Sequence, residues 1–427
     1  MDVRAFKRMV PVEKMIQCAN VSWLFVALFI PVHVLAQAPP PPPGGGLPPV
    51  LYPAENQPSE EKRVLGKILF WDEQLSSNDT VACGTCHSPS SAGGEPRFGQ
   101  HPGFDGVFGN QDDVLGSPGV VRMDVNGTPV EDSVFGFEVQ VTGRAAPSNI
   151  MGVFAGENFW DGRATPQFLN PEDTTQVLIA DFGSLESQAV GPILSSAEMA
   201  HEGRDWDDVR AKLQETTPLL MASEIPADMQ AALNVSPSYG ALFSRAFGDN
   251  EITAGRIAFA IATYERTLVP DETPWDRFMN GDRTAMTGNQ INGWDTLREN
   301  TVCLNCHRPP MFTDNRFHAI GLRPSFEDEG RFGVTDDNRD HGRFKTPSLR
   351  NVGLKSSLMH VGWIESVQDA LDFYNAGTQD TGHVQFRRDQ SVIPGTDPAR
   401  RVSDINIPPQ VQPAIVDFLV NGLTDPR

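Results

Sequence analysis

Cysteine is scarce in this sequence, which has only five in 427 residues. So few cysteines in so long a chain argue against the disulfide framework of small secreted domains. Four of the five stand in two copies of one pattern, at residues 83–87 (CGTCH) and 303–307 (CLNCH). A structural zinc site would need further Cys or His residues at short spacing from each pair. We therefore expect c-type haem attachment at both motifs, with zinc binding or a redox dithiol as the alternatives.

Positive charge is also scarce. The chain has 34 Lys and Arg against 55 Asp and Glu, a formal net charge of −21. Because binding to nucleic acid rests on cationic side chains that contact phosphates, we expect no nucleic-acid partner. The acidic surface favours a redox partner that presents a basic face.

Long hydrophobic runs are missing as well. The apolar run at residues 21–35 is shorter than the ~20 residues that span a bilayer, and Pro31 and His33 interrupt it. Basic residues precede the run and Ala-Gln-Ala follows it at 36–38, as in a secretory signal. We predict a signal peptide at residues 1–38, export to the periplasm and no stable membrane anchor. The Pro- and Gly-rich residues 39–53 form a linker.

The two CxxCH motifs carry the strongest functional signal. Two thiols at this spacing can each form a thioether with one haem, and the adjacent histidine can ligate the iron. We predict two covalent haems held by the following residues: Cys83, Cys86, His87, Cys303, Cys306 and His307.

A mainly α fold follows from the hydrophobic periodicity. Apolar residues recur at helical spacing within residues 59–70, 253–268, 290–298 and 366–374. Because a helix precedes each CxxCH motif, we predict two cytochrome c-like haem domains, at residues 54–250 and 251–427. Long loops connect the helices, including a polar insertion at 170–183, and residues 134–141 alternate enough for an arm of a short β-hairpin.

Several longer motifs add a family resemblance. They are LGKILFWDEQLS at 65–76, FWDGRA at 159–164, FTDNRFHAIG at 312–321, FKTPSLRNVGLKSSLMHVG at 344–362 and VQDALDFYNAG at 367–377. Together they resemble the bacterial di-haem cytochrome c peroxidases and their relative MauG, which oxidises tryptophans in a precursor protein. The resemblance implies two haems, one open to hydrogen peroxide and the other ligated on both sides.

Peroxide cleavage needs a group that moves a proton and a donor that holds the peroxide. Glu198, in SSAEM, is the candidate proton shuttle, and by resemblance Gln188 and Pro192 match the family's glutamine and proline beside the open haem. For Glu198 alone, a solvated surface charge is the competing interpretation. The resemblance places Trp160 of FWDGRA between the haems as an electron relay, a role that is compatible with core packing.

Tyr374 is the most informative single residue. Peroxidases of the family carry methionine at the matching position, whereas MauG carries a tyrosine that ligates iron. An anionic phenolate favours higher-valent iron and lowers the reduction potential, while a thioether does the reverse. The resemblance therefore favours the MauG-like branch and implies that Tyr374 ligates the second haem. An inward-facing core tyrosine is the alternative.

Two departures from the family stand out. The family's bridging calcium is associated with an Asn and a Thr-x-Pro step, where this chain has Ala145 and Lys355-Ser356-Ser357. We do not expect calcium there. MauG also has a tryptophan two residues before its second CxxCH motif, and here that residue is Thr301. The oxidation route or the substrate must therefore differ from those of MauG.

The remaining histidines have weaker signals. His101 is a candidate resting-state ligand of the first haem iron, with a solvated loop histidine as the alternative. Three others fall in motif segments and are candidates for contacts with haem propionates: His318, His341 and His360. Neither His201 nor His383 has an assigned role.

The sequence thus predicts a periplasmic di-haem peroxidase that reduces hydrogen peroxide at the first haem. It would share oxidising equivalents with the second haem and oxidise a redox protein or a protein side chain. The alternatives are a conventional cytochrome c peroxidase with a small cytochrome or cupredoxin donor, and a non-enzymatic di-haem electron carrier.

Overall fold

The computed structural model describes residues 46–375 and 405–427. The predicted signal peptide, the first part of the predicted linker and His383 lie outside these residues. Within them, no helix is long and apolar enough to cross a membrane.

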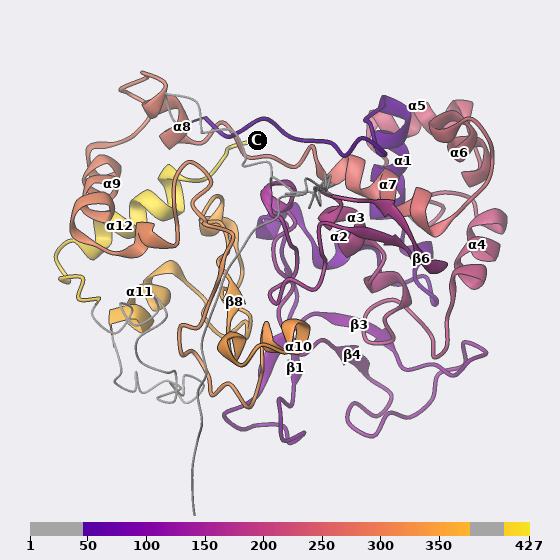
Figure 1. The fold of residues 1–427 in the computed structure, drawn as a ribbon, viewed down its shortest axis with the longest axis horizontal. Coiled ribbons are helices and arrows are strands. Elements are labelled where there is room, and N and C mark those ends of the chain that lie inside the picture. Colours follow the sequence, from indigo (N-terminus) through magenta and orange to yellow (C-terminus); the bar gives the residue numbers. More distant parts are fainter. Residues whose placement is uncertain (1–45, 376–404) are drawn as a thin grey trace, which may run out of the picture. The chain divides into compact units, whose positions relative to one another are not determined.

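Helices dominate the regular structure (Figure 1), which confirms the predicted mainly α fold. The α-helices are α1 (Glu60–Trp71), α2 (Cys83–Cys86), α3 (Ser184–Ala189), α4 (Trp206–Glu215), α5 (Ala227–Val235), α6 (Tyr239–Phe247), α7 (Ala254–Glu265), α8 (Pro274–Met279), α9 (Gly288–Asn300), α10 (Phe332–Thr335), α11 (Val367–Asn375) and α12 (Gln412–Asp417).

The described strands are short and form two-stranded antiparallel pairs. They are β1 (Gly99–His101) with β2 (Val114–Gly116), β3 (Pro118–Val121) with β4 (Val139–Val141), β5 (Phe168–Asn170) with β6 (Asp173–Ile179), and β7 (Phe317–His318) with β8 (Phe344–Lys345).

The four helices expected from periodicity form where predicted, and hydroxyl side chains cap them. Ser59 accepts a hydrogen bond from a backbone N–H in the first turn of α1, and Thr253 does the same for α7. Thr287 and Gln290 form a reciprocal capping box on α9. Such caps satisfy N–H groups that have no partner inside the helix.

The first hydrophobic core lies around α1 and α7, which pack closely in Figure 1. Gly66 allows this approach, because a Cβ atom there would lie 1.8 Å from the Ala260 carbonyl oxygen. Ile257, Ala260 and Ile261 of α7 belong to the same buried cluster as Leu65. The boundary that we expected after residue 250 would divide this cluster, so we propose a boundary after α7.

A second core forms around aromatic residues of the C-terminal half. Trp294 of α9 packs edge to face on Trp275, with ring centroids 5.5 Å apart, and also contacts Phe418. Helix α12 packs along α9 (Figure 1). The second CxxCH motif follows α9 directly, as the first follows α1 after a short connection, so each core supports one motif.

The long segment after the first motif joins the two halves. The hairpin arm predicted at residues 134–141 forms in part, because residues 139–141 are strand β4, which pairs antiparallel with β3. The backbone N–H of Leu115 donates to the Val361 carbonyl at 3.0 Å, and that of Ala145 donates to the His360 carbonyl at 2.8 Å. At the polar insertion of residues 170–183, β5 and β6 form a hairpin that sequence reasoning missed.

Candidate haem sites and the wall between them

Both CxxCH histidines are oriented by a backbone carbonyl. His87 Nδ1 lies 2.9 Å from the Gly93 carbonyl oxygen, and His307 Nδ1 lies 3.2 Å from that of Phe312. A carbonyl can only accept, so each Nδ1 carries the proton and each Nε2 keeps its lone pair. Burial lowers the pKa of both rings, which favours the neutral, ligating form. The two histidines are thus prepared as iron ligands.

Three of the four thiols lie in surroundings that disfavour the alternatives of zinc binding or dithiol chemistry. Burial raises the pKa of Cys83 to about 12, and it raises the pKa of Cys86 and Cys303 as well. A reactive or metal-binding cysteine needs a stabilised thiolate, which these surroundings oppose. Protonated thiols beside an apolar cavity are instead compatible with thioether attachment of a haem.

A cavity of about 550 Å³ adjoins the first motif. It is lined by all three haem-attachment residues of that motif and by four residues predicted to serve catalysis: Cys83, Cys86, His87, Trp160, Gln188, Pro192 and Glu198. The structure therefore brings together residues that lie more than one hundred positions apart in the sequence. A Glu198 charge at this place also acts electrostatically on His87 and both thiols.

Two residues that sequence reasoning missed hold the Glu198 segment. Gly119 of β3 packs against it so closely that a Cβ atom would lie 2.0 Å from the Ala197 carbonyl oxygen. The buried Arg204 donates to the carbonyls of Ile193 at 3.1 Å and Met199 at 3.3 Å. These contacts fix the backbone on both sides of the Glu198 carboxylate. A glycine in a strand and an isolated arginine give no such signal in the sequence.

His101 is not among the residues that line the first cavity. Its ring lies against Phe135, with centroids 5.9 Å apart, and its Nδ1 accepts from the Gly103 N–H at 3.1 Å. The described structure therefore does not bring this histidine into the first cavity with Glu198.

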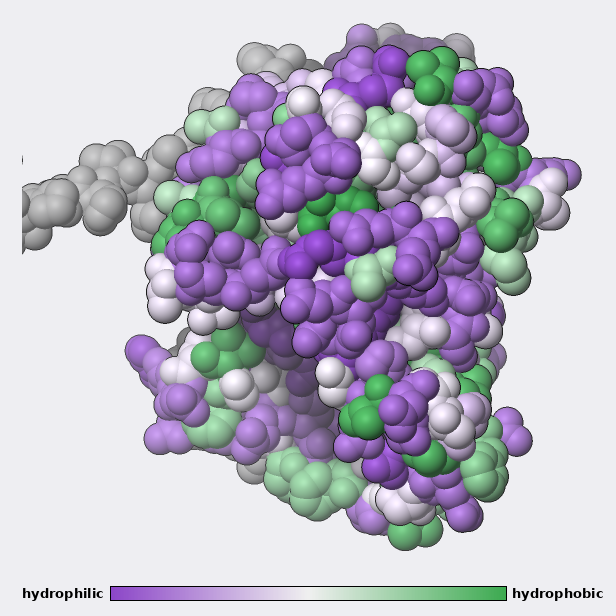
Figure 2. Space-filling model, turned by 90° about the vertical axis from the view of Figure 1, so that its right-hand side faces the viewer, coloured by the Kyte–Doolittle hydropathy of each residue, from purple (hydrophilic) through white to green (hydrophobic). Residues whose placement is uncertain are grey.

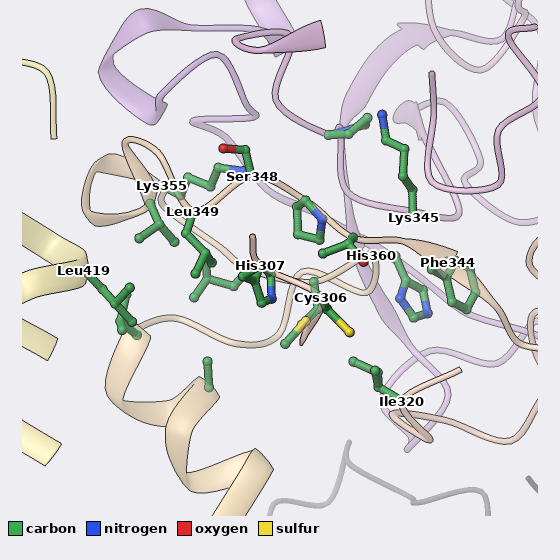
Figure 3. Close-up of a pocket in the computed structure, with 18 of the residues that line it drawn as sticks. Cys306, His307, Ile320, Phe344, Lys345, Ser348, Leu349, Lys355, His360 and Leu419 are labelled. Carbon is green, nitrogen blue, oxygen red and sulfur yellow. The ribbon is translucent and has the colours of Figure 1, made fainter. Parts of the chain in front are cut away.

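A second cavity adjoins the other motif (Figure 3). Its lining includes Cys303, Cys306, His307 and, from α11, Tyr374. Tyr374 thus shares a cavity with the histidine of the second motif, as the family resemblance requires. Met359 also lines this cavity and carries the softer sulfur donor that a methionine ligand would supply.

His360, which also lines the second cavity, offers a polar contact to a bound cofactor. His360 is 4% exposed, and its ring stacks on Phe344 with centroids 3.7 Å apart. Figure 3 shows the two rings next to each other. Burial lowers the pKa of His360 to about 3, and its Nε2 has no hydrogen-bond partner among the described residues. A buried ring nitrogen without a partner is costly unless a bound group supplies one. The apolar cavity, the CxxCH residues and this nitrogen together fit a haem.

The other histidines are dispersed. His318 lines the second cavity, and its Nε2 lies 2.9 Å from Asp314 Oδ2. His341 stacks on Phe332 and lines neither haem cavity. His201 Nδ1 lies 2.9 Å from the Glu202 carbonyl oxygen.

The two cavities share a wall. Trp160, Ala145 and Lys345 line both of them. Trp160 is 8% exposed, and the backbone N–H of Lys345 donates to its carbonyl at 2.8 Å. The predicted placement of Trp160 between the haems therefore agrees with the cavity lining.

Three charged residues that line the cavities were not predicted as site residues: Glu265, which is buried, and Lys345 and Lys355, which are half-buried. Burial lowers the pKa of Lys345 and of Lys355 to about 8, and both line the second cavity. Burial raises the pKa of Glu265, which lines the first cavity, to about 7. Lone Lys and Glu residues usually lie on the surface, so the sequence carries no signal for their burial.

The residues at the family's calcium position do not fit that ion. Ala145 has no side-chain oxygen, and its carbonyl accepts from the Trp160 indole. Lys355 brings a cation where a calcium ligand would be an oxygen. Ser356 uses both its backbone N–H and its hydroxyl on the Ser91 hydroxyl, at 3.1 and 3.0 Å.

Two prepared CxxCH sites on a mainly helical fold define a di-haem c-type protein. The family model described as di-haem cytochrome c peroxidase matches residues 60–284, more than half of the chain. The chain belongs to this family, whose members use two c-type haems. It is an oxidoreductase of the di-haem peroxidase class.

Relatives come from both branches of the family. The chain is 29% identical to the methylamine utilization protein MauG of Methylorubrum extorquens over 339 residues, covering 79% of this chain and 75% of that protein. It is 27% identical to the cytochrome c551 peroxidase of Pseudomonas aeruginosa, covering 73% and 71%. A MauG-like protein associated with microbial copper homeostasis shares the fold, with a TM-score of 0.59, 22% identity and coverage of 89% and 94%.

Proposed function

We propose that this protein is a di-haem peroxidase of the MauG-like branch. It reduces hydrogen peroxide in the cavity of His87 and Glu198 and shares oxidising equivalents with a second haem held by His307 and Tyr374. The observation that supports the branch is the common cavity of His307 and Tyr374. A family likeness alone does not separate MauG from conventional peroxidases.

The residues of the first cavity supply acid-base chemistry and positioning. Haem, when bound, supplies the redox chemistry of the iron. Glu198 takes a proton from one peroxide oxygen and returns it to the other as water leaves. Gln188 donates a hydrogen bond that holds the peroxide, and Pro192 adds apolar surface beside it. Trp160, in the wall that the two cavities share, relays electrons between them.

The oxidised partner is a redox protein or a protein side chain. The face shown in Figure 2 is mostly hydrophilic, with hydrophobic residues in small separate patches. A net charge of −21 on such a surface favours a partner with a basic face, recruited by long-range attraction. The association rate with that partner should fall as salt is added.

Export to the periplasm is part of the proposal, since c-type haem attachment and the N-terminal signal pattern point the same way. The intact mass of the protein tests it. We expect a chain that starts near residue 39 and carries two haems in thioether linkage. A mass that fits one haem or a zinc ion would overturn the assignment of both motifs.

Substitution of Tyr374 tests the branch. Tyr374→Met should raise the reduction potential of the second haem, because a neutral thioether replaces an anionic phenolate. Tyr374→Phe should change the spectrum of the second haem while the first still binds small ligands. Met359→Leu serves as the control and should leave the second haem unchanged.

A conventional peroxidase is the second candidate, and Met359 in the same cavity is the observation in its favour. If Met359→Leu changes the potential and spectrum of the second haem while both Tyr374 variants leave them intact, a methionine ligand replaces the tyrosine. The MauG-like proposal then gives way to the conventional one.

A further inference from the structure

Two half-buried lysines, Lys345 and Lys355, form no ion pair with a carboxylate of any described residue. Among the described residues, Lys345 Nζ donates to two neutral oxygens, the Glu157 carbonyl at 3.1 Å and Asn158 Oδ1 at 3.4 Å. The Glu157 carboxylate acts on it electrostatically without forming an ion pair. For Lys355, no side-chain ion pair or hydrogen bond with a described residue occurs, and burial alone shifts its pKa. The two ammonium groups are close enough to act on one another electrostatically.

Lys345 and Lys355 lie in the wall between the haem cavities. Both lysines line the second cavity and a small cavity of about 40 Å³ that also reaches Trp160. Lys345 lines the first cavity too. By contrast, the nearby Arg144 pairs with Asp161 at 2.7 Å and with Asp328 at 2.6 Å. Arg144 is therefore already neutralised by ion pairs, whereas neither lysine forms an ion pair with a described residue.

A positive charge without an ion pair is costly where the protein shields it from water. Moving one ammonium group out of water costs several kcal/mol unless a negative group compensates it. The haems of the family bring such groups, because each carries two propionate carboxylates. Of the described side chains that line the second cavity, only these two are lysine or arginine, so they are its cationic partners for a carboxylate.

We propose that Lys345 and Lys355 form a cationic site for haem propionates in the wall between the cavities, where the Lys355 ammonium takes the place of a divalent cation. Two neighbouring residues support this replacement. Ala145 has no side-chain oxygen and its carbonyl is already hydrogen-bonded to Trp160, while the Ser356 hydroxyl is hydrogen-bonded to Ser91. The proposal rests on the two haems of the family and is independent of which residue ligates the second iron.

Charge-removing substitutions test the site by the second haem's potential. Lys355→Met and Lys345→Met should each lower that potential, because a positive charge that stabilises the reduced haem is lost. Lys212→Met is the matched control. It removes the same charge from a lysine that contacts Ser76 and Asp79 and lines neither haem cavity, so the potential should not change.

Contact between Lys355 and a haem propionate can be detected by vibrational spectroscopy. The propionate bending modes in the resonance Raman spectrum should shift in Lys355→Met and stay fixed in Lys212→Met. Lys355→Gln repeats the test with a polar side chain should the methionine variant fail to mature. Unchanged potential and unchanged propionate modes in a folded, fully loaded Lys355 variant would overturn the proposal.

The replacement of a divalent cation is tested on the unmodified protein. Addition of calcium and treatment with a chelator should each leave the haem spectra and the potentials unchanged. A spectrum or potential that responds to calcium or to the chelator would show that an ion still binds, and would refute the role of Lys355 as its substitute.

Discussion

The indole nitrogen of Trp160 donates a hydrogen bond of 2.8 Å to the carbonyl oxygen of Ala145, and both residues line both haem cavities. Ala145 in turn donates from its backbone N–H to the His360 carbonyl at 2.8 Å. The Trp160 ring also packs edge to face with the His360 ring, at 6.2 Å between centroids. The indole is therefore held in one orientation in the wall that separates the cavities.

Substitution of Trp160 should distinguish a role in electron transfer from a role in packing alone. Trp160→Phe loses the hydrogen bond and leaves a buried carbonyl unpaired, which should lower the free energy of unfolding by about 1–3 kcal/mol. If the indole carries electrons, oxidising equivalents should also reach the second haem more slowly after a single addition of peroxide. Stopped-flow spectra of both haems measure that rate.

The control is Trp206→Phe, which alters an indole buried in the first core that lines neither haem cavity. It should change stability without changing the transfer rate. An equal transfer rate in Trp160→Phe and the unmodified protein would leave Trp160 a packing residue only.

Glu198 should matter for the reaction with peroxide. Glu198→Gln keeps the shape of the side chain but cannot take up a proton, so it should slow peroxide cleavage by ~10²–10⁴-fold with both haem spectra intact. Glu202→Gln, four positions along at an exposed site outside the cavity, should have no effect. If Glu198→Gln reacts with peroxide as fast as Glu202→Gln does, Glu198 is a solvated surface charge and not the proton shuttle.

The four main helices could be predicted from the sequence because their signals are local. Ser59 and Thr253 are caps, and the apolar residues that follow each of them recur at helical spacing. The hairpin of β5 and β6 escaped prediction because most of its residues face solvent, so its sequence is as polar as that of a loop. The domain boundary after residue 250 stays a prediction; helix α7 follows it in sequence yet packs on α1.

The site residues also fall into two groups, those with a local sequence signal and those that only the fold reveals. Cys83 and His87 belong to a contiguous motif, and the family motifs lead to Glu198 and Tyr374. Lys355 could be noticed only as a departure from the family, since its burial depends on chain segments far away in sequence. Arg204 carries no motif at all, and only the folded chain shows that it binds the carbonyls beside Glu198.

Buried Glu265 should make stability depend on pH. Its Oε1 accepts from Asn149 Nδ2 at 3.3 Å, and its Oε2 has no partner among the described residues. Because burial raises its pKa from 4.5 to about 7, the folded chain retains a proton that the unfolded chain releases between these values. The free energy of unfolding should therefore fall as pH rises through this window, by at most about 3 kcal/mol.

Denaturant titrations of the haem-loaded protein at a series of pH values measure this dependence. Glu265→Gln should flatten the decline and should be relatively more stable than the unmodified protein above pH 7. The exposed Glu215→Gln should keep the decline. The same slope in Glu265→Gln and the unmodified protein would mean that another group titrates.

The central claim is that the first haem is open to peroxide while the second is ligated on both sides. The cavity that Glu198, Gln188 and His87 line supports the first part of this proposal, and the cavity that His307 and Tyr374 share supports the second. An electron paramagnetic resonance spectrum of the ferric protein tests it most directly. We predict one high-spin haem signal and one low-spin signal, the latter altered by Tyr374→Met. Two low-spin signals would contradict this claim and would fit a six-coordinate electron carrier instead.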